Sequence, residues 1–295
     1  MIQFPRMSIR QITIIGTGLI GGSFGLAVKK AGFRGKIIGC DRKEILSKAK
    51  RKRAIDTGVD DPIQACNGSD VVLLAVPVGG IIEFIATLAP HLSPDTVLTD
   101  VGSTKSEILR SAEKAFGIAT AQRFLGGHPM AGKENSGIGL ADPELFRGAV
   151  WFITPTRNQN LRSKSIAEFL GLVKKVGARI AVLDGTEHDE LCAWISHVPQ
   201  MISTALSSTL VEEYGENAPL LESGGRALRE MTRIAASPYS MWRDIAITNK
   251  ESIADALLKL EQKLAHIREN LDTRELEQEF DQAHRLKQLA KKKPR

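Results

Sequence analysis

Short apolar runs alternate with helical patterns along the first half of the chain. Compact runs rich in β-branched residues predict buried strands at residues 11–15, 36–40, 71–76, 97–98 and 124–127. Between these runs, apolar residues recur at helical spacing over residues 20–31, 44–53, 81–88 and 105–116. Buried strands that alternate with helices are typical of βαβ units, so the sequence predicts an α/β fold with a doubly wound parallel sheet.

The pattern changes after about residue 154. Strand-like runs become scarce, and the last clear one covers residues 178–183. Apolar residues then recur three and four positions apart from Leu191 to Leu210 and again from Ile253 to Leu271, which is typical of amphipathic helices. The sequence therefore predicts two domains, a dinucleotide-binding domain over residues 1–154 and an all-helical domain over residues 155–295.

The apolar series that starts at Ile253 keeps a heptad-like rhythm, which Leu276, Phe280 and Leu289 extend. Such a long stripe can belong to the core of the helical domain or to an interface between two copies of the chain. A small helical domain has limited core of its own, which favours a homodimer formed through part of this stripe.

Composition and charge are those of an ordinary soluble protein. The chain has 295 residues, 42% hydrophobic and 25% charged, with a net charge of +6. The basic residues are spread along the chain except at residues 51–53 and 291–295, and a basic end is usually a solvated tail. We therefore expect no nucleic-acid partner, whereas a modest positive field would attract an anionic small-molecule substrate.

The three cysteines, Cys40, Cys66 and Cys192, lie far apart without a Cys-x-x-Cys spacing. This argues against a disulfide framework and against a metal site, and it suits a reducing compartment. The apolar run over residues 12–28 looks like a signal peptide, but its glycines are spaced for a dinucleotide turn. No stretch approaches the roughly 20 apolar residues of a membrane helix. We therefore expect a cytoplasmic protein that does not associate with membranes.

The sequence Gly-Thr-Gly-Leu-Ile-Gly follows the first predicted strand and opens the first predicted helix. Gly16, Gly18 and Gly21 fit the roles of a tight turn, close approach to a pyrophosphate and helix–strand packing. The helix that contains Leu19 and Ile20 would present free amides and a partial positive charge to the phosphates. This motif in this setting predicts a Rossmann-type dinucleotide site.

Asp41 lies about 20 residues beyond the motif, where this type of site places an acid for the ribose 2′-hydroxyl. Its carboxylate would repel the 2′-phosphate of NADP, so we expect NAD as cofactor. Arg42 follows directly and would soften that preference. Val76 and Pro77 end another predicted strand, and we expect them to line the same cleft.

His128 stands between glycines at the end of the last predicted strand, and ligands of such sheets bind outside these strand ends. A neutral imidazole there can accept a proton while a hydride departs, although a histidine can also merely hydrogen-bond a turn. Ser103 ends the preceding strand and should lie beside it. Its hydroxyl can share the reacting oxygen of the substrate or cap the helix near Lys105, and these roles are compatible.

The helical domain offers side chains that would bind an acid. Asp189, Ser196 and Gln200 fall near one face of the helix that begins around residue 186, which Pro199 would kink. Arg233, set among apolar residues, can bind a carboxylate with two hydrogen bonds. Arg243 stands next to Asp244 and is better explained as part of an ion pair.

Taken together, these motifs resemble those of the prephenate/arogenate dehydrogenases, over about residues 12–271. The motifs that carry the resemblance are Gly-x-Gly-Leu-Ile-Gly-Gly-Ser at 16–23, Asp-Val-Gly-Ser-x-Lys at 100–105, Gly-Gly-His-Pro-Met-Ala-Gly at 126–132, Ser-Gly at 136–137, His-Asp at 188–189, Ser-His-Val-Pro at 196–199, Thr-Arg-Ile-Ala at 232–235 and Trp-Arg-Asp-Ile at 242–245.

This resemblance implies that prephenate and NAD are converted to 4-hydroxyphenylpyruvate, carbon dioxide and NADH, on the pathway to tyrosine. It implies that His128 bonds the ring 4-hydroxyl and accepts its proton, that Ser103 assists at that oxygen, and that Arg233 binds a carboxylate. The enzyme then needs only to orient the C–H bond of the ring carbinol toward the nicotinamide and to polarise the carbinol oxygen. Loss of the ring carboxylate drives the reaction, because it produces an aromatic ring.

Two positions depart from the family pattern. Gln200 stands where many prephenate-specific relatives carry a second histidine, and Lys133 stands where some relatives carry threonine. Both positions are expected to face the substrate side chain, so an arogenate or dual-specificity cyclohexadienyl dehydrogenase is the alternative. A β-hydroxyacid dehydrogenase would need a lysine in the helix after residue 186, which is absent. A dinucleotide-sensing protein would not need His128, Ser103 and Arg233 together.

Overall fold

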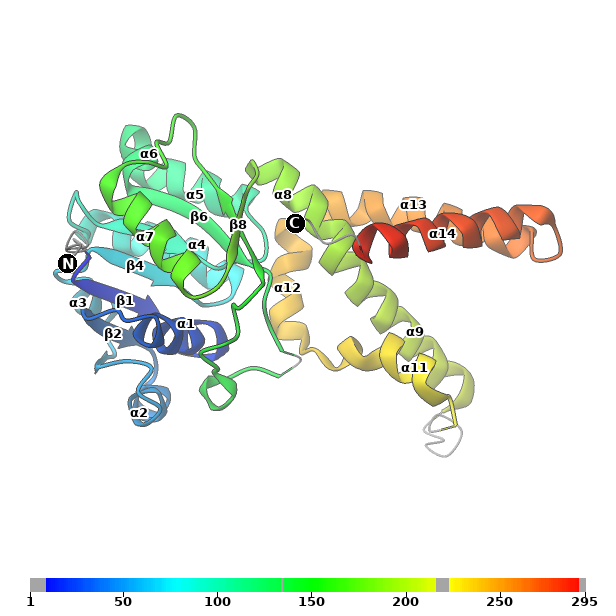
Figure 1. Ribbon diagram of the computed structural model, residues 1–295, viewed down its shortest axis with the longest axis horizontal. Helices are drawn as coiled ribbons and strands as arrows, with labels where there is room; N and C mark the ends of the chain where they lie inside the picture. Colours follow the sequence, from blue (N-terminus) through cyan, green and yellow to red (C-terminus); the bar gives the residue numbers. More distant parts are fainter. Residues whose placement is uncertain (1–8, 134, 216–222, 292–295) are drawn as a thin grey trace.

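The computed structural model describes residues 9–133, 135–215 and 223–291, so the basic segment 292–295 lies outside the described residues. A single sheet of eight strands, in the order β3-β2-β1-β4-β5-β6-β7-β8, forms the first part of the chain. Helices lie against this sheet, and a helical region follows it (Figure 1). The predicted α/β sheet followed by a helical region is therefore confirmed.

The predicted strands and helices of the first half are found within a few residues of their expected bounds, and the structure adds β3, β7, α3, α6 and α7, which the sequence analysis did not predict. The strands are β1 (Gln11–Ile15), β2 (Lys36–Cys40), β3 (Thr57–Val59), β4 (Val71–Leu74), β5 (Val97–Asp100), β6 (Phe124–Pro129), β7 (Val150–Thr154) and β8 (Arg179–Val182). The helices are α1 (Leu19–Lys30), α2 (Lys43–Arg51), α3 (Pro62–Cys66), α4 (Val78–Leu88), α5 (Ser106–Phe116), α6 (Thr120–Arg123) and α7 (Lys164–Lys175).

The sheet is not parallel throughout. Strands β1 to β6 run in one direction in the order typical of dinucleotide-binding folds, but β7 pairs with β6 antiparallel, and β8 pairs with β7 parallel. The chain returns from β6 to β7 without a full crossover helix, which an antiparallel pair does not need. The predicted doubly wound parallel sheet is therefore confirmed for β1 to β6, and the antiparallel β7 is an addition at its edge, because periodicity does not record strand direction.

The sheet also extends past residue 154, because β8 belongs to it and α7 connects β7 to β8. Phe169 of α7 is fully buried in the same core as Phe24, Phe146 and Trp151. We therefore propose that the sheet domain ends at about residue 183.

The helical region consists of α8 (Gly185–Cys192), a π-helical segment (Ala193–His197), α9 (Val198–Tyr214), α11 (Gly225–Thr232), the short helix η5 (Arg233–Ala236), α12 (Tyr239–Thr248), α13 (Lys250–Glu269) and α14 (Arg274–Lys291). The π-helical segment ends two residues before Pro199, which lacks an amide hydrogen, so the predicted irregularity falls here. Across the described ranges, no helix combines the length and apolar character that crossing a membrane requires.

Helices α13 and α14 form a hairpin that extends away from the sheet (Figure 1). The apolar side chains along this hairpin are largely uncovered in the single chain. Those more than half exposed include Leu258, Leu264, Leu271, Phe280 and Leu286. The buried core of this region is small and consists of Ala193, Val198, Ile245, Ile253 and Ala256. Much of the apolar stripe predicted from residue 253 onward is therefore not covered by the chain's own core.

The turn between β1 and α1 depends on two glycines. Gly16 has a φ of +89°, which residues with a Cβ rarely adopt. Gly21 lies so close to the turn that an added Cβ would be 2.0 Å from the carbonyl oxygen of Gly16 and 2.7 Å from Cγ2 of Ile14. Close packing at Gly21 therefore fixes the position of the α1 N-terminus relative to the sheet.

We expect Gly21→Ala to lower the free energy of unfolding by about 1–3 kcal/mol, because the added methyl overpacks this contact. Gly171→Ala is the matched control, since Gly171 also lies inside a helix but an added Cβ there meets no atom within 4 Å. The control should raise stability by about 0.5–1 kcal/mol through helix propensity. Urea unfolding measures both, and equal gains in the two variants would contradict the packing argument.

Candidate active site

A cavity of about 570 Å³ lies along the ends of the parallel strands. Its walls come from the β1–α1 turn, the ends of β2, β4, β5 and β6, the loop that follows β6, and the N-terminal part of α12. In such sheets ligands bind at the crevice where the strand order reverses, here between β1 and β4. The cavity therefore joins the predicted dinucleotide turn to Ser103 and His128, the residues predicted to act on the substrate.

The predicted cofactor residues lie in this cavity, with one exception. Its lining includes Gly16, Gly18, Leu19, Ile20, Asp41, Arg42, Val76 and Pro77, whereas Gly21 packs behind the turn. Gly18 is the N-cap of α1 without a side-chain cap, and the first turn contains no acidic residue. An added Cβ at Gly18 would meet nothing within 4 Å. This open, positively polarised helix end fits the pyrophosphate of a dinucleotide.

Asp41 is held in one orientation at the end of β2. One carboxylate oxygen accepts the backbone N–H of Thr17 at 2.8 Å, and the other accepts the N–H of Arg42 at 2.8 Å. Its remaining acceptor capacity faces a cavity that it lines. The site therefore places a fixed negative charge near the dinucleotide turn.

His128 on β6 and Ser103 after β5 both line the cavity, as predicted. His128 is only 7% exposed, and Ser103 is half-buried. Ser103 does not cap α5, because that helix begins at Ser106 without a cap from its own N-cap side chain. Instead, the carboxylate of Asp189 on α8 accepts the backbone N–H groups of Lys105 at 2.7 Å and Ser106 at 2.8 Å.

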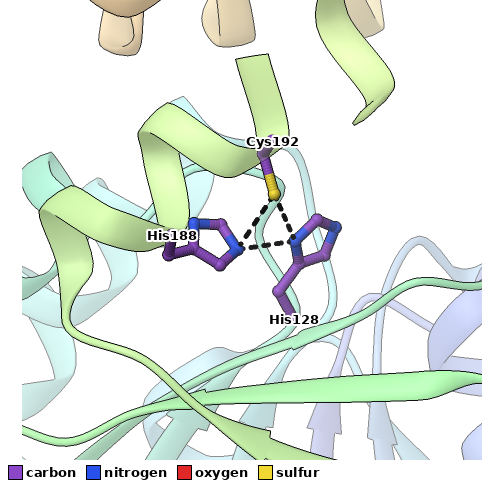
Figure 2. A group of neighbouring side chains, drawn as sticks. All are labelled: His128, His188 and Cys192. Atoms are coloured by element: carbon purple, nitrogen blue, oxygen red, sulfur yellow. Dashed lines mark hydrogen bonds between the residues drawn. The ribbon is translucent and has the colours of Figure 1, made fainter. Parts of the chain in front are cut away.

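A chain of hydrogen bonds connects His128 to Asp189. Nδ1 of His128 lies 2.9 Å from Nε2 of His188 (Figure 2), and Nδ1 of His188 lies 2.9 Å from Asp189 Oδ1. The Asp189 carboxylate only accepts, so His188 carries its proton on Nδ1 and leaves Nε2 as an acceptor. His128 therefore donates from Nδ1, and the lone pair of His128 is on Nε2, the nitrogen that points away from His188 in Figure 2.

Burial keeps both imidazoles neutral. It lowers the pKa of His128 well below its ordinary value, and His188 and the positive charge of Lys105 lower it further. Burial also lowers the pKa of His188, although the hydrogen bond to Asp189 opposes this. For Asp189, burial alone would raise the pKa, but hydrogen bonds from His188 and Ser106 outweigh it and lower the pKa. The site thus holds two neutral rings and one carboxylate.

A buried ion pair positions the strand segment that carries His128. Lys105 and Asp100 are fully buried and form a salt bridge. Lys105 Nζ also donates to the carbonyl of Gly127 at 2.8 Å, and Asp100 Oδ1 accepts the N–H of Gly127 at 3.1 Å. The backbone N–H and carbonyl of Gly127, the residue before His128, are therefore both hydrogen-bonded to the Lys105–Asp100 ion pair.

The predicted substrate-binding residues do not all meet here. Lys133 lines the cavity, and its ammonium lies 3.5 Å from Asp142. Asp189 has protein partners on both carboxylate oxygens, so it positions His188 and α5 rather than contacting a ligand. Gln200 is buried and donates to Thr204 at 3.2 Å. Ser196 and Gln200 are both absent from the cavity lining.

Arg233 also lies outside the cavity lining of the single chain. It is exposed on η5, and only from Pro238 onward do residues of this segment reach the cavity. The expected convergence of Arg233 and His128 in one cavity is therefore not found within one chain. Helical periodicity predicted the helices but not which of their ends would face the sheet.

Several residues of the site were not expected as such. Helix α12 and the residue before it line the cavity with Pro238, Ser240, Met241 and Ile245. His188 and Cys192 lie one turn apart on α8 and both approach His128, with Cys192 Sγ 3.4 Å from His188 Nε2. Their spacing of four residues in the sequence indicates that they share one face of a helix. The sequence does not indicate that this helix, α8, packs beside β6.

Comparison with known proteins places the chain in one family over nearly its whole length. The family described as "Prephenate dehydrogenase, nucleotide-binding domain" matches residues 24–182, and "Prephenate dehydrogenase, dimerization domain" matches residues 184–287. The chain is 34% identical to a prephenate dehydrogenase of Lactococcus lactis subsp. cremoris (strain MG1363), over 95% of this chain and 77% of that protein. It is 30% identical to a cyclohexadienyl dehydrogenase of Zymomonas mobilis, over 84% of each.

Its structure is also similar to that of a solved enzyme. The crystal structure of prephenate dehydrogenase from Aquifex aeolicus in complex with hydroxyphenyl propionate and NAD+ superposes with a TM-score of 0.85. The two chains are 32% identical, and the match covers 97% of this chain and 98% of the other. With its nucleotide-binding sheet, its helical dimerization domain and these relatives, the chain belongs to the prephenate dehydrogenase family of oxidoreductases.

Proposed function

We propose that this enzyme converts prephenate to 4-hydroxyphenylpyruvate with NAD, a step toward tyrosine. The observation that supports this most strongly is one cavity that joins the dinucleotide turn to His128. The hydrogen-bond chain to Asp189 leaves the Nε2 lone pair of His128 available as a base. The related Aquifex aeolicus enzyme binds hydroxyphenyl propionate and NAD+, which are similar in shape to the proposed product and identical to the proposed cofactor.

In this mechanism His128 Nε2 accepts the proton of the ring 4-hydroxyl, and Ser103 donates a hydrogen bond to the same oxygen. The nicotinamide, when bound, supplies the hydride acceptor for the carbon that bears this hydroxyl. Departure of the ring carboxylate as carbon dioxide leaves its electron pair in the ring, which becomes aromatic. His128 then returns the proton to the phenolate oxygen, so no net proton is consumed.

The Asp189–His188 pair acts on this reaction only through His128. While His188 accepts the Nδ1 proton of His128, the base cannot adopt the tautomer with its proton on Nε2. The surrounding burial keeps water away and holds the imidazole neutral before the proton arrives. His188 and Asp189 are therefore positioning residues in this proposal.

Asp41 supports NAD over NADP. Its carboxylate is oriented by two backbone amides and lines the cavity at the end of β2, where the 2′-hydroxyl of the adenosine ribose would lie. A 2′-phosphate there would face a fixed negative charge. Arg42 also lines the cavity, so the preference is a ratio rather than an absolute exclusion.

Lys133 supports a dianionic substrate. Among the described residues that line the cavity, the lysine and arginine side chains are Lys133 and, at the cofactor end, Arg42. We propose that its ammonium binds the pyruvyl carboxylate of prephenate. Arogenate carries an ammonium group at this end, which Lys133 would repel, so we place arogenate second. The relative named cyclohexadienyl dehydrogenase keeps a dual-specificity enzyme as the alternative.

We also propose that the enzyme is a homodimer formed through the helical domain. The α13–α14 hairpin exposes large apolar side chains that the single chain leaves uncovered, and the matching family is described as a dimerization domain.

We propose a cytoplasmic location. All three cysteines are free and buried, which suits the reducing cytoplasm.

The function is tested by offering the purified protein prephenate or arogenate with NAD or NADP and following the absorbance of the reduced nicotinamide. We expect the highest kcat/KM with prephenate and NAD. Absence of reduction with every pair would refute the proposed activity, and faster reduction of arogenate would reverse the substrate assignment.

The variant His128→Asn tests the role of His128 as the base in the same assay. Its amide cannot accept the hydroxyl proton, so turnover should fall by about 10²–10⁴-fold. Cofactor affinity, measured by calorimetry with NADH, should stay near the unsubstituted value because His128 lies outside the dinucleotide turn. A variant that binds NADH and still turns over at the normal rate would rule out the base.

Lys133→Thr should raise the KM for prephenate by about tenfold, which corresponds to loss of about 1.4 kcal/mol of binding energy. We expect kcat to change less, and the ratio of prephenate to arogenate use to fall. Lys114→Thr, which removes an exposed lysine from α5 outside the cavity, is the control and should leave both constants unchanged. An unaltered KM in Lys133→Thr would exclude the contact.

The dimer is tested by sedimentation of the double variant Leu264→Glu/Leu271→Glu. Carboxylates at these exposed apolar positions would be costly to bury between two chains, so the variant should sediment as a monomer. Gln262→Glu adds a carboxylate to an exposed polar position of α13, the helix that contains Leu264, and should leave the dimer intact. A monomeric unsubstituted protein would contradict the proposal.

A further inference from the structure

Three atoms that commonly bind metal ions meet beside the cavity. Nδ1 of His128, Nε2 of His188 and Sγ of Cys192 lie within 4.8 Å of one another, and all three residues are buried. Figure 2 shows the three atoms directed toward a common point. Among the residues that the structure describes, this is the one such group of three.

The distances are close to those of a tetrahedral zinc site. Zinc–nitrogen bonds of about 2.0–2.1 Å and zinc–sulfur bonds of about 2.3 Å imply separations of about 3.3 Å between nitrogens and about 3.6 Å between nitrogen and sulfur. The nitrogens here are 2.9 Å apart, and the sulfur lies 3.4 Å and 3.8 Å from them. A shift of a few tenths of an ångström would therefore form the site.

The surroundings of His188 give a second, independent indication. A histidine that binds a metal usually donates its other ring N–H to a carboxylate, which fixes the ring. His188 does this with Asp189, whose carboxylate is itself fixed by the amides of Lys105 and Ser106. His188 and Cys192 are four residues apart on one helix, so both present their ligand atoms from the same face.

We propose that His128, His188 and Cys192 bind a thiophilic divalent cation such as Zn²⁺, and that the bound ion inhibits the enzyme. Binding would replace the His128–His188 hydrogen bond by two metal–nitrogen bonds and the Cys192 S–H bond by a metal–sulfur bond. The thiol proton leaves to solvent, and the His128 proton moves from Nδ1 to Nε2. The protonated Nε2 cannot accept the substrate hydroxyl proton.

The inhibitory part rests on the proposed function, whereas the metal site does not. An ion on Nδ1 would lie on the His188 side of the ring, opposite the nitrogen assigned to the substrate. It would therefore not reach the reacting oxygen to polarise it. Catalysis and metal binding instead require opposite tautomers of His128, so one excludes the other.

Inhibition is tested with chelator-treated enzyme titrated with Zn²⁺ in a buffer that does not bind metals. We expect turnover to fall in the unsubstituted enzyme, and Cys192→Ser to need at least about tenfold more Zn²⁺ for the same loss. Cys66→Ser removes a buried cysteine on α3 and should keep the original sensitivity. Activation by Zn²⁺, or equal sensitivity of Cys192→Ser, would overturn the proposed inhibition.

Binding is tested separately with Co²⁺, whose bond to a thiolate gives a charge-transfer absorption. The unsubstituted enzyme and Cys66→Ser should show this band, and Cys192→Ser should not. Cys192→Ala serves as a second variant, and circular dichroism verifies the fold of each. Because this readout needs no turnover, it distinguishes a missing metal site from a wrong activity. Absence of the band in the folded unsubstituted enzyme would refute the site.

Discussion

The buried carboxylate of Asp189 is the contact on which the site depends. It accepts the two backbone N–H groups at the start of α5 and the ring N–H of His188. A carboxylate removed from water is costly unless hydrogen bonds replace the lost solvent, and here three donors do so. These donors come from the sheet domain and from α8. The same contact therefore holds the helical region against the sheet and fixes the tautomer of His188, and through it that of His128.

The Lys105–Asp100 pair is the matching constraint on the other side of His128. It is fully buried, and it holds both the N–H and the carbonyl of Gly127. The backbone amide of Lys105 is bound by Asp189, while its ammonium binds Asp100, so this residue links the two networks. Breaking either network would leave an uncompensated buried charge, which costs several kcal/mol. The imidazole of His128 is thus positioned through the backbone of Gly127, which the ion pair holds, and through its own ring nitrogen, which contacts His188.

Local signals in the sequence predicted the features that depend on local structure. The glycine turn, the acid at Asp41 and the placement of His128 at the strand end follow from patterns within a few residues, and the structure has them in one cavity. The antiparallel β7, the engaged carboxylate of Asp189 and the exposed position of Arg233 depend on contacts between distant segments. A polar stripe on a helix indicates which side chains share a face, but not whether that face meets a ligand or another helix.

The same burial that keeps the His128 imidazole neutral also acts on the neighbouring thiol of Cys192. Burial raises the pKa of this thiol to about 12, so it stays protonated and is a poor nucleophile. Its weak S–H donor lies 3.4 Å from Nε2 of His188 and 3.8 Å from Nδ1 of His128. Only a cation strong enough to displace the thiol proton would recruit the sulfur, and it must also break a 2.9 Å contact between two imidazoles. The site therefore favours ions that bind sulfur and nitrogen strongly, and disfavours Mg²⁺ and Ca²⁺, which prefer oxygen ligands.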